Sequence, residues 1–89
     1  MKISVVTICY NSKLFIEKTI LSVINQSYED LEYIVVDGGS TDGTLDVIHK
    51  YSNRITKWIS EKDEGIYNAM NKALDIITGD WVIFMNSGD

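Results

Sequence analysis

Apolar positions along the chain alternate between the spacing of buried strands and the spacing of helices with one buried face. Residues 2–10 are rich in β-branched side chains and almost continuously apolar, as in a strand covered on both faces. Residues 31–36 have the same character and end on Asp37. Residues 55–60 alternate like a strand, and residues 81–85 form another apolar run. The pattern therefore predicts four strands.

The segments between these strands have helical spacing. In the first segment, Asn11 and Ser12 offer an N-cap. The apolar residues that follow recur on one face of a helix: Ile16, Ile20, Val23 and Ile24. A short helix is predicted over residues 44–51. The third helix has the clearest period, and its apolar face comprises Ile66, Met70, Ala73, Leu74 and Ile77. Gly79 follows it, at a place where a residue in the left-handed conformation commonly ends a helix.

Strands that alternate with helices predict an α/β fold, because each helix returns the chain across the sheet and leaves the strands parallel. We expect a βαβαβαβ order within a mostly parallel three-layer sandwich. The 89 residues, of which 45% are hydrophobic, suit one small domain with one core. Parallel strands place every strand-to-helix loop at the same edge of the sheet, where ligands of open α/β sheets bind.

The charge of the chain limits its partners. Thirteen acidic residues against 8 basic ones give a net charge of -5, which excludes a uniformly basic face for nucleic acid. An acidic protein can still bind an anionic nucleotide when a divalent cation lies between carboxylate and phosphate.

Localisation signals are sparse. The apolar runs are too short to cross a bilayer, and the N-terminus lacks a small-residue cleavage site. Cys9 is the only cysteine, so no intrachain disulfide can form, and we expect it to pack in the core. A cytoplasmic location fits these features best.

Residues 37–44 carry the strongest functional signal. Asp37 follows a buried strand, where its carboxylate can accept hydrogen bonds from the N–H or hydroxyl groups of a ligand, and the glycines after it allow the backbone to approach closely. The alternative is a helix-entry turn in which Thr41 or Asp42 caps the second helix. We favour the ligand interpretation for Asp37 and the capping interpretation for Asp42.

Spacing excludes several other motifs. Counted from Asp37, the third, fifth and twelfth positions of a calcium loop hold Gly39, Thr41 and Ile48, which are not the required ligands. The first strand is followed by Tyr-Asn-Ser-Lys rather than by a phosphate-binding glycine loop. Receiver domains place acidic residues at the end of the first strand, and this chain has none there.

Two further residues are candidates for ligand contacts. Asp89 follows Ser87 and Gly88 after the fourth strand, where a carboxylate can hold Mg²⁺ or Mn²⁺ that bridges two phosphates; the alternative is an ordinary turn. Tyr10 can stack on a base, or it can end its strand and pack on the first helix. Both alternatives stay open for Tyr10.

Five segments of the chain together resemble the start of the family 2 glycosyltransferases with a GT-A fold, which is Rossmann-like. They are residues 7–11, 22–28, 33–44, 63–72 and 84–89. The last two look like the branch that makes bacterial surface polysaccharides. The resemblance covers nearly the whole chain, in order, and does not indicate the sugar.

The resemblance implies a domain that binds a nucleoside-diphosphate sugar, usually a UDP-sugar. By position, Thr7 and Tyr10 would line the uracil pocket, and Asp37 would contact the base or ribose. Asp63 would lie in the loop over the nucleoside. Asp89 would bind the metal, Mn²⁺ or Mg²⁺. Many relatives have paired aspartates at this place, whereas this chain has glycine before Asp89.

The resemblance also implies a reaction and its partners. The sugar would pass with inversion to the hydroxyl of a glycan or lipid-linked acceptor, in some relatives at the inner face of a membrane, with peripheral association. The general base and the acceptor-binding residues of the family come later than Asp89. Residues 1–89 are therefore expected to be the donor-binding part of a single GT-A domain.

Two other classes remain as alternatives. A non-catalytic α/β interaction domain or receiver-like module would use the same polar loops only as turns and caps. A nucleotidyltransferase of similar fold is disfavoured, because a glycine-rich activating loop should follow its first strand.

Overall fold

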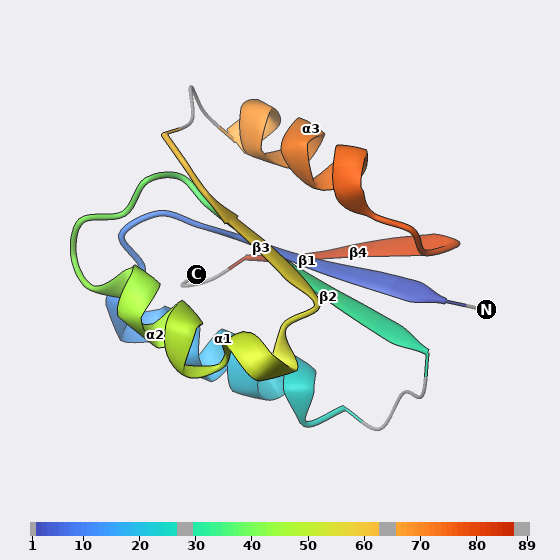
Figure 1. Cartoon of the computed structure of the whole chain (residues 1–89), viewed down its shortest axis with the longest axis horizontal. Coiled ribbons are helices and arrows are strands. Elements are labelled where there is room, and N and C mark those ends of the chain that lie inside the picture. Colours follow the sequence, from blue (N-terminus) through green and yellow to red (C-terminus); the bar gives the residue numbers. More distant parts are fainter. Residues whose placement is uncertain (1, 27–29, 63–65, 87–89) are drawn as a thin grey trace.

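The computed structural model describes residues 2–26, 30–62 and 66–86, which form a four-stranded parallel sheet with helices on both faces (Figure 1). The strand order is β3-β2-β1-β4. The strands are β1 (Ile3–Cys9), β2 (Leu31–Asp37), β3 (Lys57–Ser60) and β4 (Trp81–Asn86). The helices are α1 (Lys13–Ile24), α2 (Thr44–Lys50), the 3₁₀ turn η1 (Ser52–Arg54) and α3 (Ile66–Ile76). The predicted α/β class, element order and parallel sheet are confirmed.

The helices form two layers around the sheet. Helices α1 and α2 cover one face and α3 covers the other, with β1 and β2 in the middle of the sheet (Figure 1). This arrangement explains the continuously apolar β1 and β2, because a central strand covered on both faces has no solvent-facing side. None of the described helices is long and apolar enough to cross a membrane.

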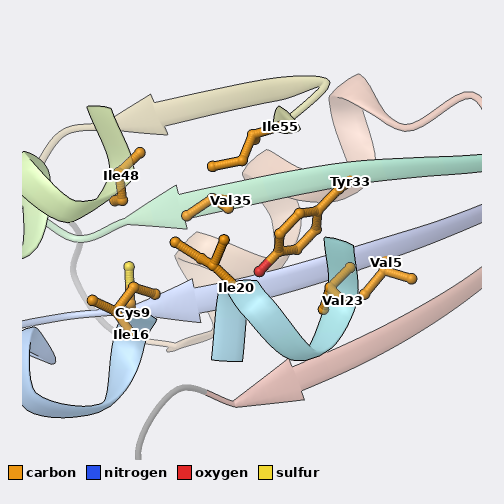
Figure 2. Close-up of a cluster of buried hydrophobic side chains, with 9 residues drawn as sticks. All are labelled: Val5, Cys9, Ile16, Ile20, Val23, Tyr33, Val35, Ile48 and Ile55. Atoms are coloured by element: carbon orange, nitrogen blue, oxygen red, sulfur yellow. The ribbon is translucent and has the colours of Figure 1, made fainter. Parts of the chain in front are cut away.

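Each face of the sheet has its own apolar cluster. The larger one lies under α1 and α2 and includes Ile16, Ile20 and Val23, the predicted buried face of the first helix (Figure 2). Within it the ring of Tyr33 is 1% exposed, and burial raises the pKa of Tyr33 to about 12. The smaller cluster, under α3, comprises Val6, Ile34, Val36, Ala69 and Ala73.

Two details of the third helix differ from the sequence prediction. Leu74, placed on the apolar face, is 50% exposed, whereas Ala69, which was not placed there, is buried beside the correctly predicted Ala73. Gly79 does not adopt the left-handed conformation expected of a helix stop. Its lack of a side chain serves a close approach instead, because a Cβ there would lie 2.3 Å from the Ser4 Oγ.

A buried hydrogen-bond network closes the amino end of the sheet beside Gly79. Glu32 is 3% exposed and accepts hydrogen bonds from the Ser4 hydroxyl at 2.7 Å and the Thr78 N–H at 2.8 Å. Burial acts to raise the pKa of Glu32, but these hydrogen bonds outweigh it and lower the pKa below its ordinary value. The network joins β1, β2 and the α3–β4 turn at the end of the sheet opposite the loops described next.

Candidate functional site

The strand ends at the carboxyl edge of the sheet are aligned side by side. Cys9 pairs with Asp37 across β1 and β2, and Asp37 pairs with Ser60 across β2 and β3. Laterally paired residues point to the same face of a sheet, so these three side chains meet. Asp37, the residue at this edge with the strongest functional signal, thus lies between the ends of β1 and β3.

Asp37 organises this edge through its carboxylate. The Oδ2 atom accepts hydrogen bonds from the backbone N–H groups of Gly39 at 3.1 Å and Ser40 at 2.9 Å, and from the Ser60 hydroxyl at 2.9 Å. The Oδ1 atom accepts from the Ser40 hydroxyl and, at 3.4 Å, from the Cys9 thiol. One residue therefore ties β1, the β2–α2 loop and the end of β3 together.

These bonds use the whole carboxylate of Asp37, which is 0% exposed. The role of Asp37 as a contact to base or ribose stays a prediction. The geometry adds a role that the sequence did not indicate, because five protein donors converge on Asp37 and fix the course of the loop after it.

Cys9 lies beside this carboxylate as a buried thiol, 3% exposed. Burial raises the pKa of the Cys9 thiol well above its ordinary value, and the neighbouring Asp37 charge raises it further. The thiol is therefore protonated at neutral pH, which agrees with the predicted packing role.

The β1–α1 and β2–α2 loops are bonded to each other directly. Asn11 donates its backbone N–H to the Ser40 Oγ at 2.7 Å and accepts the Thr41 N–H on its side-chain Oδ1 at 2.8 Å. The Ser12 N–H donates to the Thr44 Oγ1 at 2.9 Å. The two loops run side by side at the carboxyl end of the sheet (Figure 1) and form one surface.

Asp42 caps two helices with one carboxylate. Its Oδ1 accepts the N–H of Thr44, the first residue of α2, and its Oδ2 accepts the N–H of Lys13, the first residue of α1. Asp42 thus serves the helix-entry turn as predicted, although it lies one residue before Gly43, the N-cap residue of α2; the Ser12 side chain makes no capping bond. Hydrogen bonds, first of all from the Thr44 hydroxyl, hold the pKa of Asp42 below its ordinary value, so the cap is ionised at neutral pH.

Two glycines shape the second loop. Gly39 and Gly43 adopt φ values of 86° and 102°, in the left-handed region where residues with a side chain are strained. A Cβ on Gly39 would also lie 3.2 Å from the Cα of Lys62, so the start of the β3–α3 loop rests on the β2–α2 loop. Glu61 and Lys72 form an ion pair at 2.9 Å that joins this third segment to α3.

The two residues assigned to a uracil pocket lie in different environments. Tyr10 follows β1 and is 63% exposed, so most of its ring is accessible at the edge. Thr7 is 0% exposed, and its hydroxyl is hydrogen-bonded to the Tyr33 hydroxyl at 2.7 Å under α1. The structure brings Tyr10 and Asp37 to the same edge and places the Thr7 side chain in the apolar layer; the Thr7 contact to uracil stays a prediction.

The remaining two candidates, Asp63 and Asp89, lie outside the described residues. Within residues 2–26, 30–62 and 66–86, no three histidine, cysteine or acidic side chains gather as a metal site. Asp37 and Asp42 lie in this part of the chain, but their carboxylate oxygens already accept hydrogen bonds from the protein.

Sequence reasoning placed Asn11 at this edge but missed its bonds to the β2–α2 loop, and it missed Ser60 altogether. Asn11 was assigned to a possible helix cap, although its φ of 46° is a conformation that asparagine tolerates better than most residues. Ser60 lies 23 positions after Asp37, and its contact depends on the β2–β3 register, which the sequence does not show.

Comparison with known proteins identifies the family. Residues 4–89 match Glycosyl transferase family 2, and the chain belongs to this family. It is 41% identical over 90 residues to the Bacillus subtilis (strain 168) protein named as a teichuronic acid biosynthesis glycosyltransferase, TuaG; this match covers 98% of the chain and 36% of the relative.

Two solved structures share the fold. S. aureus TarS 1-349, in complex with UDP-GlcNAc, matches with a TM-score of 0.85 at 32% identity over 97% of this chain and 26% of that one. The mannosyltransferase PcManGT from Pyrobaculum calidifontis, in complex with GDP-Man and Mn²⁺, matches with a TM-score of 0.87 at 28% identity over 96% of this chain and 27% of that one. The four parallel strands are the N-terminal part of a GT-A-like fold.

Proposed function

We propose that this chain is the donor-binding part of a glycosyltransferase that moves a sugar from a UDP-sugar to an acceptor hydroxyl with inversion, in bacterial surface-polysaccharide synthesis. The observation that carries the proposal is the carboxyl edge, where Asp37 and Asn11 join two loops into one surface beside an exposed Tyr10. Ligands of open α/β sheets bind at this edge. The match to a protein solved with UDP-GlcNAc supports a uridine nucleotide as the ligand.

The described residues suggest how the nucleoside would be held. The exposed ring of Tyr10 offers a face on which a base can stack. Asp37 would hold the loop beside the base and ribose in its bound shape, since its own carboxylate is buried. Thr7 would support the end of β1 beneath the uracil pocket through its bond to Tyr33, and Asp63 would lie over the nucleoside.

A divalent cation, Mn²⁺ or Mg²⁺, completes the proposed donor site. The carboxylate assigned to the metal is Asp89, by its position in the family resemblance; Asp37 and Asp42 already accept hydrogen bonds from protein donors. PcManGT and a Mycobacterium tuberculosis glucosyl-3-phosphoglycerate synthase of similar fold were solved with Mn²⁺, which supports manganese as the cation of the proposed site. The ion, when bound, would neutralise charge on the diphosphate leaving group.

The acceptor and the general base belong to the rest of the proposed enzyme. The chain spans between 26% and 36% of the length of TuaG, TarS 1-349 and PcManGT. We assign to the remaining part the base that deprotonates the acceptor hydroxyl and the surface that binds a glycan or lipid-linked acceptor. Residues 1–89 alone would then bind the donor weakly if at all and would not transfer the sugar. We place the proposed enzyme in the cytoplasm or at the inner face of the membrane.

The Asp89→Ala variant of the full-length protein tests the proposed metal contact. We expect the Kd for UDP, measured by calorimetry with Mn²⁺, to rise roughly tenfold or more, because the cation loses a protein ligand. Release of UDP from UDP-GlcNAc should fall at least in parallel.

A matched control is Asp75→Ala, which removes an exposed carboxylate from α3. It should leave both the UDP affinity and the turnover unchanged. Equal Kd values for the wild type and Asp89→Ala in the presence of Mn²⁺ would remove Asp89 from the metal site.

A further inference from the structure

Asn11 joins the β1–α1 loop to the β2–α2 loop by hydrogen bonds that neither loop can form on its own. Asn11 is exposed, and its backbone φ of 46° lies in the left-handed region. In this conformation its N–H reaches the Ser40 Oγ while its side-chain Oδ1 reaches the Thr41 N–H. Both bonds cross between segments 29 and 30 positions apart in the sequence.

The same contact continues to the buried carboxylate. Ser40 accepts the Asn11 N–H on its hydroxyl oxygen and donates that hydroxyl to the Asp37 Oδ1. Asp37 in turn accepts the Ser60 hydroxyl from the end of β3. A continuous series of hydrogen bonds therefore runs from the residue after Tyr10, through Ser40, to the third strand.

Asn11 joins the two loops at the point next to the Tyr10 ring on which a base would stack. Tyr10 is the preceding residue, so the backbone conformation of Asn11 sets the start of the turn that carries the exposed Tyr10 ring. The side chain of Asn11 holds the Thr41 N–H toward this turn. Loss of this bond would loosen the loops at the end next to Tyr10, while the bonds of Ser12 to Thr44 and Lys13 to Asp42 remain. Asn11 belongs to neither apolar cluster.

We propose that Asn11 is a positioning residue for the nucleoside: its bonds to Ser40 and Thr41 hold Tyr10 and the Asp37 loop at the spacing that a uridine base requires. The proposal rests on the proposed function above. Asn11 itself need not touch the ligand, and its effect is on donor affinity rather than on the transfer step.

Two variants separate the bond from the backbone conformation. Asn11→Gly keeps the left-handed φ at no steric cost and removes the Oδ1 acceptor; Asn11→Asp keeps an acceptor and tolerates the same φ. In the full-length protein we expect Asn11→Gly to raise the Kd for UDP with Mn²⁺ and the KM for the donor by about fivefold, with kcat little changed. The Kd of Asn11→Asp for uridine should lie within about twofold of the wild-type value, because uridine has no phosphate for the new carboxylate to repel.

Amide hydrogen exchange of the unliganded protein gives a readout that needs no donor. Exchange at Thr41 should accelerate in Asn11→Gly and stay slow in Asn11→Asp, because only the first variant frees the Thr41 N–H. Thr78→Val is the control, since it removes a hydroxyl bond to Glu32 at the opposite end of the sheet. It should lower the melting temperature and leave the Kd for UDP unchanged.

The outcomes distinguish the two proposals. If the wild type binds UDP and Asn11→Gly binds it equally well, the positioning role is wrong and the donor site stands. If Thr78→Val weakens binding as much as Asn11→Gly does, the effect is one of stability and the positioning role is also wrong. If the wild type binds neither UDP nor uridine, the proposed function fails and the role of Asn11 in it fails too, whatever the exchange rates.

Discussion

Replacing Asp37 by alanine is expected to lower the free energy of unfolding by about 3 kcal/mol, the largest loss we predict for a residue at the carboxyl edge. Alanine would leave two backbone N–H groups and the hydroxyls of Ser40 and Ser60, all partly buried, without their shared acceptor. For a chain of this size the melting temperature should fall by roughly 10–20 °C. Urea unfolding of the wild type and the variant measures the loss.

Two further variants make this result interpretable. Asp37→Asn keeps the size of the side chain but replaces one acceptor oxygen by a donor, so its loss should lie between those of the wild type and alanine. Asp75→Ala removes an exposed carboxylate from α3 and should change the unfolding free energy by no more than about 0.5 kcal/mol. A change in Asp37→Ala as small as that in Asp75→Ala would contradict the role of Asp37 as organiser of the edge.

The second large effect is expected at the opposite end of the sheet, for Gly79→Ala. The added Cβ would lie 2.3 Å from the Ser4 Oγ and 2.9 Å from the Ser4 backbone N, closer than real Cβ atoms come to any neighbour. Ser4 is fully buried and bonded to Glu32, so it has little room to move. We expect a loss of about 2 kcal/mol, measured by urea unfolding.

A double-mutant cycle with Ser4→Ala identifies the cause. Removal of the Ser4 hydroxyl removes the nearest clash but also the bond to Glu32, so each single variant should be destabilised. The double variant should lose less than the sum of the two, because the new Cβ then occupies part of the vacated space. Strict additivity would show that the contact between residues 4 and 79 is not the reason for glycine at this position.

The sequence was sufficient for the fold class because its strongest signals are those of central parallel strands. β1 and β2 are covered on both faces, and their unbroken apolar runs predicted them directly. β3 was placed two residues too early, since a 3₁₀ turn over 52–54 and an extended Ile55 come before the paired segment that begins at Lys57. Periodicity marks an extended chain but does not show where its ladder begins.

Small residues caused the errors in the third helix. The predicted apolar face included Ala73 and Ile77, which do pack on the sheet, but it included Leu74, which is half exposed, in place of the smaller Ala69, which is buried. Gly79 was assigned to a helix stop because it follows the helical pattern. The residue that it contacts, Ser4, lies 75 positions earlier and could not be identified from that pattern. Close approach between distant segments leaves no periodic signal in the sequence.

The candidate site was predictable in position but not in detail. Parallel topology alone brought Tyr10, Asp37 and Asp42 to one edge, and Asp42 caps α2 as expected. The double use of Asp42, the burial of Asp37 and the bonds of Asn11 depend on how two loops meet across 29 or 30 positions. These contacts follow from tertiary structure, which local propensity does not encode.

The most direct test of the central claim is a calorimetric titration of the full-length protein with UDP, first with Mn²⁺ and then with the metal removed by EDTA. We expect UDP to bind with Mn²⁺ and the Kd to rise roughly tenfold or more in EDTA, because the cation lies between the protein carboxylate and the diphosphate. No heat of binding with Mn²⁺, or the same affinity in EDTA, would contradict a metal-dependent nucleotide-sugar site at the carboxyl edge of this sheet.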